Sequence, residues 1–218
     1  MIHKNNVKVV TSKSNHLVPK INNIELHSIY DPQKEANALL LKYGDKIKNN
    51  KFVLVLGLGF AYHVDQIIIE LEKHHNNNYK LLIVEQNSAI YHVFLKNFPE
   101  KFKNINVEII HGQKIKNLYR NISFLNLLAK HPVIIAHPQS FHMYRKYFDE
   151  LLSWRIDNRL ETIAPIIKNG ELAHFLREQS EQHETIEDLI RSSHKKNLCK
   201  HQLLLLAFNE INKRSLRE

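Results

Sequence analysis

The sequence predicts an α/β fold of the Rossmann type, with a doubly wound, mainly parallel sheet followed by a C-terminal helical appendage. Apolar runs of strand length alternate with amphipathic segments of helix length from residue 51 to residue 138. A glycine turn, Gly57-Leu58-Gly59, joins the first of these runs to a helical segment. From residue 139 onward no further strand pattern occurs. Strands buried on both faces lack polar alternation, and crossovers of helix length join parallel neighbours.

The four strands are expected where the apolar runs are continuous, and a helical pattern separates each run from the next. Bounding glycines, asparagines and prolines mark the ends of these elements. The expected strands are 51–57, 80–86, 105–112 and 131–138, and the expected helices between them are 62–75, 88–98 and 114–130.

The region before the first of these strands is expected to contain little regular structure until a helix begins. It is polar and has one weak strand candidate, Val7–Val10. Asp31 followed by Pro32 is a helix-start signal, because the aspartate side chain caps free amides and proline suits the first helical turn. The helix is expected to end at Gly44.

We expect three parts in the chain: a polar N-terminal segment (1–25), a Rossmann-like α/β domain (26–165) and a C-terminal helical region (166–218). The stretch 140–167 is expected as one long amphipathic helix that breaks near Pro165. The last helix carries a strongly apolar stripe, which must pack on the core or on another copy of the chain. The second case would make the protein a homo-oligomer.

Composition and charge are those of a globular protein. Of the 218 residues, 43% are hydrophobic and 24% are charged, close to the average of globular domains. The single cysteine, Cys199, excludes an intrachain disulfide and a cysteine-based zinc cluster, and we expect a cytoplasmic location. No stretch approaches the roughly 18 apolar residues of a membrane span. The net charge of +9 favours an acidic partner, but the basic residues are spread among Glu and Asn, so nucleic acid is not expected as a partner.

Polar groups and glycines follow the predicted strands at the edge where open α/β sheets bind ligands. Gly57 and Gly59 allow a sharp turn that brings free amides at a helix start close to a ligand. Glu85 ends the next strand, where an acid accepts hydrogen bonds from ribose hydroxyls. The alternative is a structural turn without a ligand, and Tyr62 in place of a third glycine argues against a dinucleotide. The candidate ligand-binding residues are Gly57, Gly59, Tyr62, His63, Glu85, Asn87, His137 and Ser140.

No motif of a catalytic nucleophile is present, so catalytic residues are not assigned. The sequence has no G-x-S-x-G elbow, no phosphate loop ending in Gly-Lys-Ser/Thr and no paired-carboxylate motif. Its 15 histidines show no metal-ligand spacing, since His74 and His75 are adjacent at a helix end and His137 and His142 are five apart. A metal site is therefore not expected. His63 and His137 are interpreted as polar groups that line the cleft, or as capping and packing residues.

Two motifs lie one after the other, LHSIYDPQKEANALL at 26–40 and VLVLGLGFAYHVDQI at 53–67. Together they resemble the N-terminal part of the motility-associated factor (Maf) flagellin glycosyltransferases. That family often carries Ser-x-Tyr-(Asp/Asn)-Pro-x-x-Glu-Ala and then Gly-Leu-Gly-x-Gly-Tyr-His. The resemblance covers roughly residues 24 to 165. The matching residues are Ser28, Tyr30, Asp31, Pro32, Glu35 and Ala36, followed by Gly57, Leu58, Gly59, Tyr62 and His63.

The resemblance implies a role in the modification of flagellin with nonulosonic acids such as pseudaminic acid, from CMP-activated donors. For this chain it implies a Rossmann-like domain that binds a nucleotide or nucleotide sugar, or that docks flagellin or another protein of the glycosylation pathway. Ala61 replaces the usual glycine of the turn, and the family's central domain, with its Gly-x-Gly-Pro-Ser type loop, is absent from the sequence. Since transferase chemistry is expected in that central domain, the resemblance favours binding over stand-alone catalysis.

Two other functions stay open. An S-adenosylmethionine-dependent methyltransferase also has a glycine turn after its first strand and an acid after its second, so S-adenosylmethionine is a candidate ligand beside a CMP-sugar. Against it, Leu56 stands where methyltransferases often place an acid, and the fourth strand ends in His-Pro-Gln-Ser rather than an Asn-Pro-Pro-Tyr type motif. The third hypothesis is a non-catalytic interaction module whose C-terminal helices form the functional surface.

Overall fold

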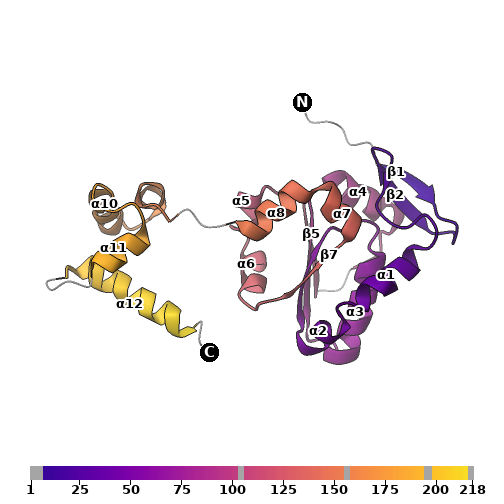
Figure 1. Cartoon of the computed structure of the whole chain (residues 1–218), viewed down its shortest axis with the longest axis horizontal. Helices are drawn as coiled ribbons and strands as arrows, with labels where there is room; N and C mark the ends of the chain where they lie inside the picture. The colour runs from indigo at the N-terminus through magenta and orange to yellow at the C-terminus, as the bar shows by residue number, and fades with distance from the viewer. Residues whose placement is uncertain (1–6, 103–105, 155–157, 194–197, 216–218) are drawn as a thin grey trace. The chain divides into compact units, whose positions relative to one another are not determined.

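The chain divides into two compact units, a larger one spanning Met1–Trp154 and a smaller one spanning Arg155–Glu218. The computed structural model describes residues 7–102, 106–154, 158–193 and 198–215 (Figure 1). The division lies earlier in the chain than the expected boundary at residue 165, and the N-terminal segment belongs to the larger unit.

A four-stranded parallel sheet forms the centre of the larger unit and confirms the predicted α/β Rossmann-like fold. The strand order is β6-β5-β4-β7, so the order reverses at β4, the first strand in sequence. Each neighbouring pair is parallel and in register over four or five residue pairs. The strands are β4 (Phe52–Leu56), β5 (Lys80–Glu85), β6 (Val107–His111) and β7 (Val133–Ala136).

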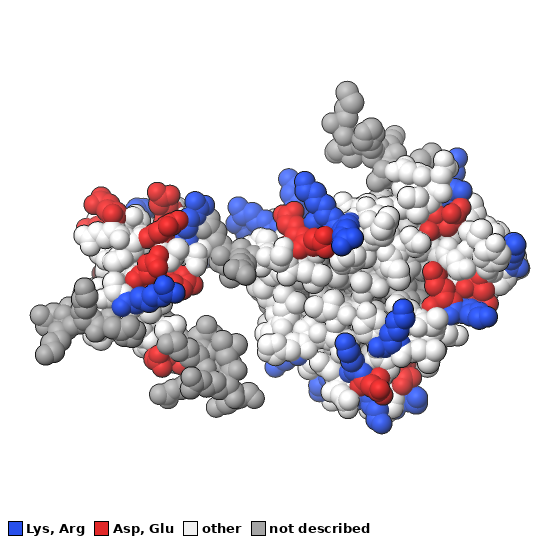
Figure 2. All heavy atoms as spheres, in the orientation of Figure 1, with Lys and Arg blue, Asp and Glu red and all other residues white. Residues whose placement is uncertain are grey.

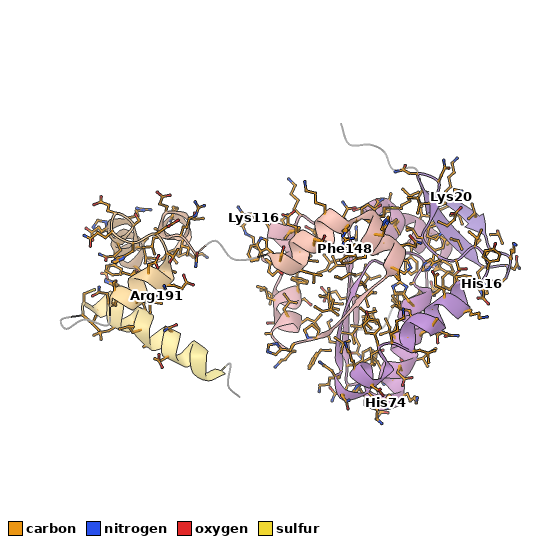
Figure 3. All side chains as sticks on the ribbon, viewed as in Figure 1. His16, Lys20, His74, Lys116, Phe148 and Arg191 are labelled. Carbon is orange, nitrogen blue, oxygen red and sulfur yellow. The ribbon has the colours of Figure 1, made fainter. Side chains whose placement is uncertain are left out.

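Helices cover both faces of the sheet because alternate side chains of its strands point to opposite sides. Val53 and Val55 of β4 pack in one hydrophobic cluster, whereas Leu54 and Leu56 pack in the other. Phe148, labelled in Figure 3, is fully buried in the second cluster. The first face is covered by α1 (Pro32–Leu40), α2 (Gly44–Asn49), α3 (Tyr62–His75) and α4 (Ser88–Asn97), and the second by α5 (Ile115–Leu118), α6 (Ile122–Leu128) and α8 (Arg145–Ser153).

Three helix expectations need correction. Gly44 does not end a helix but begins α2. The expected helix 114–130 is two short helices, because the Asn121 side chain accepts a hydrogen bond from the Phe124 amide and caps α6. The expected long helix 140–167 is interrupted at Tyr144, whose backbone (φ −114°, ψ 33°) separates α7 (Pro138–Met143) from α8.

Residues 7–25 are more ordered than their polar composition predicts. They form a three-stranded antiparallel sheet of β1 (Lys8–Thr11), β2 (Leu17–Ile21) and β3 (Ile24–Glu25). The weak strand candidate Val7–Val10 corresponds to β1, whereas β2 was not expected. Asn22 and Asn23, with φ of 48° and 65°, make the two-residue turn between β2 and β3. Asparagine tolerates such positive φ, which a two-residue hairpin with a primed turn requires.

The predicted helix start at Asp31 is confirmed, and it leads to a stability prediction. The Asp31 side chain accepts hydrogen bonds from the amides of Gln33 and Lys34, each at 3.0 Å. We expect Asp31→Ala to lower the free energy of unfolding of the larger unit by about 1 kcal/mol, the usual effect of losing an N-cap. Urea unfolding followed by the fluorescence of Trp154, which stacks on Tyr119 inside this unit, measures the change.

The control for this substitution is Asp45→Ala. Asp45 is an exposed acid in the first turn of α2, and the residue that caps this helix, Tyr43, makes no side-chain cap hydrogen bond. We expect the control to change the unfolding free energy by less than about 0.5 kcal/mol. Equal unfolding midpoints for the two variants would contradict a capping role for Asp31.

The smaller unit is helical and has its own hydrophobic cluster, formed by Leu160, Ala164, Leu176 and Leu189. Leu205 of the last helix packs against this cluster, whereas its neighbours Leu203 and Leu204 are about half exposed, at 54% and 44%. The elements are α9 (Leu160–Ile163), the 3-10 helix η1 (Ala164–Ile166), α10 (Gly170–Gln179), α11 (Ile186–Ser192) and α12 (Lys200–Ser215).

Positive and negative side chains are interspersed on the face shown in Figure 2. Opposite charges also pair directly in the larger unit: the ammonium of Lys101 lies 2.6 Å from a carboxylate oxygen of Asp65, and that of Lys20 lies 2.8 Å from a carboxylate oxygen of Glu25. This face therefore has no large area with charges of a single sign, in agreement with the mixed charge pattern of the sequence. Among the residues that the structure describes, no helix is both long and apolar enough to cross a lipid bilayer.

Candidate functional site

The predicted glycine turn connects β4 to α3 and is buried from residue 57 to residue 64. Gly57 and Gly59 have φ of 97° and 52°, values that favour glycine. A Cβ atom on Gly57 would lie 2.3 Å from the Cβ of Ser140, and one on Gly59 would lie 2.4 Å from Nε2 of His27. Both glycines are therefore required by the close approach of other chain segments. Ala61, where the Maf family has glycine, also has a positive φ of 65°.

Glu85 ends β5, as predicted, but its side chain points into the protein. It is fully buried, and its two carboxylate oxygens accept hydrogen bonds from the amides of Leu58 (2.8 Å) and Asn87 (2.9 Å). Burial raises the pKa of the Glu85 carboxyl to about 7, although backbone hydrogen bonds, one of them from Gly59, act in the opposite direction.

The carboxylate of Glu85 thus binds the backbone donors that a nucleotide would need at this turn. A phosphate or ribose at the turn would compete with a hydrogen bond to Leu58 that is already formed within the fold. Nor does the acid face outward to a ribose. The structure brings Gly57, Gly59 and Glu85 together, as the sequence predicts, but as one internal hydrogen-bonded unit.

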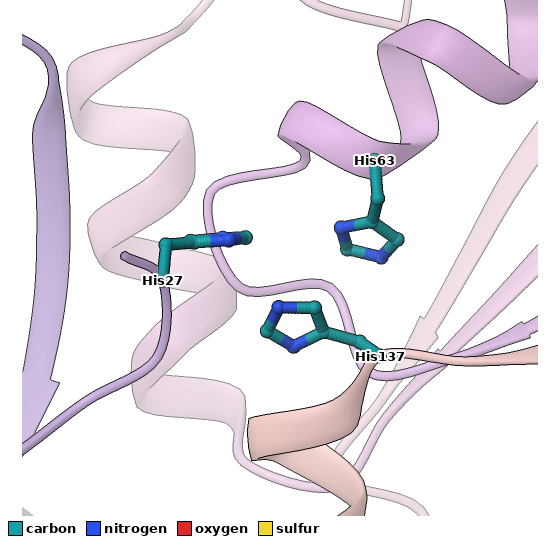
Figure 4. Close-up of side chains that lie close together, drawn as sticks. All are labelled: His27, His63 and His137. Atoms are coloured by element: carbon teal, nitrogen blue, oxygen red, sulfur yellow. The ribbon is translucent and has the colours of Figure 1, made fainter. Parts of the chain in front are cut away.

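Three histidines meet beside the turn, as Figure 4 shows. His27 comes from the chain after β3, His63 from the first turn of α3 and His137 from the residue between β7 and α7. The His63 and His137 rings stack at 4.5 Å between centroids with 14° between planes, and the His27 ring lies 4.5 Å from that of His137. Each histidine is at most 4% exposed. Desolvation lowers the pKa of all three rings, in the case of His63 to about 3, so they are neutral at pH 7.

Two nitrogens of this cluster have no hydrogen-bond partner among the described residues. His63 donates from Nε2 to the carbonyl oxygen of Gly57 at 3.0 Å, which leaves its Nδ1 buried and unpaired. The Nδ1 of His137 pairs with the hydroxyl of Ser140 at 2.8 Å and accepts a longer hydrogen bond, of 3.4 Å, from the Ser140 amide. The Nε2 of His137 stays buried and unpaired. His27 differs, because its Nε2 accepts a hydrogen bond from the Phe60 amide at 2.8 Å. Its Nδ1 lies 3.6 Å from Glu35.

A small cavity of about 190 Å³ opens beside the three rings, and Glu35 and Lys42 also line it. His137 follows β7 and the turn follows β4, so the cavity lies where the strand order reverses, the usual ligand position in an open α/β sheet. Pockets for drug-sized ligands hold about 300–1,000 Å³, so this cavity is too small for a nucleotide. A larger hollow of about 600 Å³, lined by Asn50, His131 and Val133, lies at the amino ends of β4 and β7 and contains none of the predicted site residues.

The Ser28–Glu35 motif mainly builds the start of α1. The hydroxyl of Ser28 accepts hydrogen bonds from the amides of Tyr30 and Asp31, and Glu35 accepts one from the Ser28 amide at 2.9 Å. The two motifs meet in space, because the His27 ring, next to Ser28, contacts Tyr62 edge-on at 5.1 Å. Tyr30 is different, since its side chain is 62% exposed and has the Lys13 ammonium 4.3 Å from its ring centroid.

The remaining predicted site residues have structural contacts. Tyr62 donates its hydroxyl hydrogen bond to the carbonyl of Leu17 at 2.7 Å. Asn87 caps α4 by accepting from the Ala89 amide, and its side-chain amide donates to the Tyr144 hydroxyl at 2.8 Å. Ser140 is fully buried beside Gly57.

Sequence reasoning did not identify His27 as part of the site. The spacing of histidines within one helix does not indicate this cluster, because the three rings come from segments far apart in sequence. The available signal was the position of His27 directly before Ser28, at the beginning of a motif that was already linked to the glycine turn.

The comparisons with known proteins add little to this geometry. No family model and no curated protein matches the chain. Among solved structures, the fold is similar to that of MnmC2 from Aquifex aeolicus, with 13% sequence identity and a TM-score of 0.38. The likeness covers 56% of this chain and 47% of that one, so the chain spans about half the length of that protein. A likeness this distant carries no information about function.

Proposed function

We propose that this chain is a binding domain that docks a protein partner in a Maf-like flagellin glycosylation pathway. The observation that carries the proposal is the closed glycine turn. Glu85 binds the Leu58 amide from within the fold, and residues 57–64 are all buried. The turn therefore serves as a structural corner, and the proposed function does not use it to hold a CMP-sugar or S-adenosylmethionine.

The proposed contact with the partner is Tyr30. The other residues of its motif have contacts that form the start of α1, whereas the Tyr30 ring is largely in solvent. Ile29, its neighbour, is 42% exposed. Exposed tyrosines bury a large apolar area with few rotatable bonds and are frequent among the residues that dominate binding energy at protein interfaces. Flagellin is the first candidate partner because of the resemblance to the Maf family.

Binding of purified flagellin, measured by titration calorimetry, tests this function. We expect Tyr30→Ala to weaken the affinity about tenfold or more, the effect of removing an interface residue that contributes over 1 kcal/mol. The matched control is Leu41→Ala, which removes another exposed apolar side chain, 87% exposed, and should leave the affinity unchanged. If the two variants bind flagellin equally well, Tyr30 is not the contact.

A thermal-shift series with CMP, a CMP-sugar, S-adenosylhomocysteine and NAD tests the closed turn separately. We expect no rise in melting temperature with any of them, because a ligand stabilises a fold only in proportion to its binding. Stabilisation by S-adenosylhomocysteine would overturn the proposal in favour of a methyltransferase. Stabilisation by the CMP compounds would instead favour a nucleotide-sugar site.

A further inference from the structure

We propose that His27, His63 and His137 form a binding site for a divalent transition-metal ion of the zinc class. One nitrogen of each ring lies within 4.8 Å of a nitrogen of the other two. In Figure 4 the rings extend from three separate segments toward a common space. The cluster lies at the reversal of the strand order, and it is independent of the docking function proposed above.

Two of the ligand nitrogens are buried and have no partner in the described part of the chain. Nδ1 of His63 and Nε2 of His137 belong to side chains that are 2% exposed, and neither atom has a hydrogen-bond partner among the described residues. Buried polar atoms are nearly always paired in folded proteins, so two unpaired ring nitrogens side by side need an explanation. A bound cation would pair both of them at once.

The opposite nitrogens of these two rings have the partners that metal-binding histidines usually have. The Nε2 of His63 pairs with the Gly57 carbonyl. The Nδ1 of His137 pairs with the Ser140 hydroxyl and also accepts a longer hydrogen bond, of 3.4 Å, from the Ser140 amide, so the ring proton is on Nε2 without the ion. Metal binding at Nε2 moves this proton to Nδ1, which then donates to the Ser140 hydroxyl. Such outer hydrogen bonds fix the tautomer and the orientation of a metal-binding imidazole. They hold each ring with its unpaired nitrogen inside the cluster.

His27 supplies the third nitrogen through a small rearrangement. Its Nδ1 faces the carboxylate of Glu35, so its Nε2 carries the lone pair, which now accepts the hydrogen bond from Phe60. Metal binding replaces that amide at Nε2. Zinc–nitrogen bonds of about 2.0–2.1 Å in a tetrahedron bring the ligand nitrogens to roughly 3.3 Å from one another. The rings therefore close on the ion by tilting out of the His63–His137 stack.

The donor set indicates the class of metal and of its further ligand. Imidazole nitrogens suit zinc, copper and nickel, whereas magnesium and calcium prefer oxygen. The fourth position faces the cavity of about 190 Å³ that Glu35 and Lys42 line. Three neutral ligands bring no charge of their own, and the Glu35 carboxylate, 3.6 Å from Nδ1 of His27, offsets only part of the charge of the ion. The fourth ligand is therefore a small anion or an ionised water, and the exposed Lys42 helps to attract it.

Titration of the EDTA-treated full chain with cobalt(II) tests the site. We expect one cobalt ion per chain, with the intense visible bands of a four- or five-coordinate ion, and displacement of cobalt by an equivalent of zinc. His63→Gln and His137→Gln should each weaken binding more than the roughly 10–100-fold loss that follows removal of an outer hydrogen bond. Ser140→Ala, which removes such an outer bond from His137, should weaken it roughly tenfold.

The controls remove histidines outside the cluster. His74→Gln alters the same helix as His63, and the double variant His92→Gln/His111→Gln removes another close pair, whose ring centroids are 5.5 Å apart. Both should bind cobalt like the unaltered chain. If the unaltered chain gives only the weak bands of a six-coordinate ion, or if His63→Gln and Ser140→Ala leave the titration unchanged, the site does not exist and the histidines are a packing cluster. The spectrum of the unaltered chain decides the matter even if a histidine variant fails to fold.

Discussion

Replacing Gly57 by alanine is expected to destabilise the larger unit by about 3 kcal/mol or more, since both backbone strain and overpacking oppose the substitution. The backbone at Gly57 has φ of 97°, and the new Cβ would lie 2.3 Å from the Cβ and 2.8 Å from the Oγ of Ser140. Ser140 is fully buried, so any shift that relieves this contact must displace other packed atoms. Urea unfolding followed by Trp154 fluorescence measures the loss.

Gly44→Ala is the matched control, because a Cβ on Gly44 meets no atom within 4 Å and the residue begins a helix. We expect it to leave stability unchanged or to raise it by less than about 1 kcal/mol. Adding Ser140→Gly to Gly57→Ala should restore the part of the unfolding free energy that is lost to the steric clash, whereas the part lost to backbone strain should remain. A double-mutant cycle measures the coupling between the two positions. If Gly57→Ala is as stable as the unaltered chain, Gly57 does not approach Ser140 closely and the closed arrangement of the turn is wrong.

The stability of the larger unit is expected to depend on pH through Glu85, whose pKa is raised to about 7 in the folded chain. The unfolded chain releases this proton near its ordinary value of about 4.3. Between these two values the folded state binds more protons than the unfolded state, so the contribution of Glu85 to stability falls as the pH rises. The loss between about pH 4.5 and pH 7.5 amounts to roughly 3 kcal/mol, at 1.36 kcal/mol for each pKa unit.

Glu85→Gln isolates this contribution, because glutamine does not titrate. The difference in unfolding free energy between the unaltered chain and the variant should decrease by roughly 3 kcal/mol over that pH range, while other groups cancel in the difference. Glu25→Gln is the control. The hydrogen bond from Lys20 lowers the pKa of Glu25, so its contribution is lost only as the pH falls below the ordinary range of a glutamate. A constant difference for Glu85→Gln would mean that the carboxyl group is solvated rather than buried.

The sheet was predictable because its two central strands, β4 and β5, contain continuous apolar runs and helix-length segments separate the strands. Val53 and Leu54 are buried on opposite faces of the sheet. Such burial on both faces, together with connections of helix length, is typical of a parallel sheet with helices on both sides. The N-terminal sheet was missed for a local reason. Pro19 argues against a strand around it, and the two-asparagine turn at 22–23 was the one signal that favoured a hairpin.

The candidate site was predictable in its positions and not in its contacts. The sequence correctly placed Gly57, Gly59 and Glu85 at strand ends, since strand ends follow from the apolar pattern. It could not show that the carboxylate of Glu85 turns inward to the Leu58 amide, because that depends on which chain segment covers the carboxyl ends of the strands. That segment is the N-terminal one with His27. Neither periodicity nor residue spacing in the sequence predicts its position over the glycine turn.

The strand order has a consequence for the growing chain on the ribosome. β4 pairs with β5 soon after it is made, but its other edge pairs only with β7, about eighty residues later in the sequence. Until then an apolar strand edge is exposed, which is a hazard for aggregation in large domains that fold during synthesis. His137 arrives directly after β7, so the histidine cluster is completed only when that edge has been paired. The cluster thus marks the last step in the assembly of the sheet.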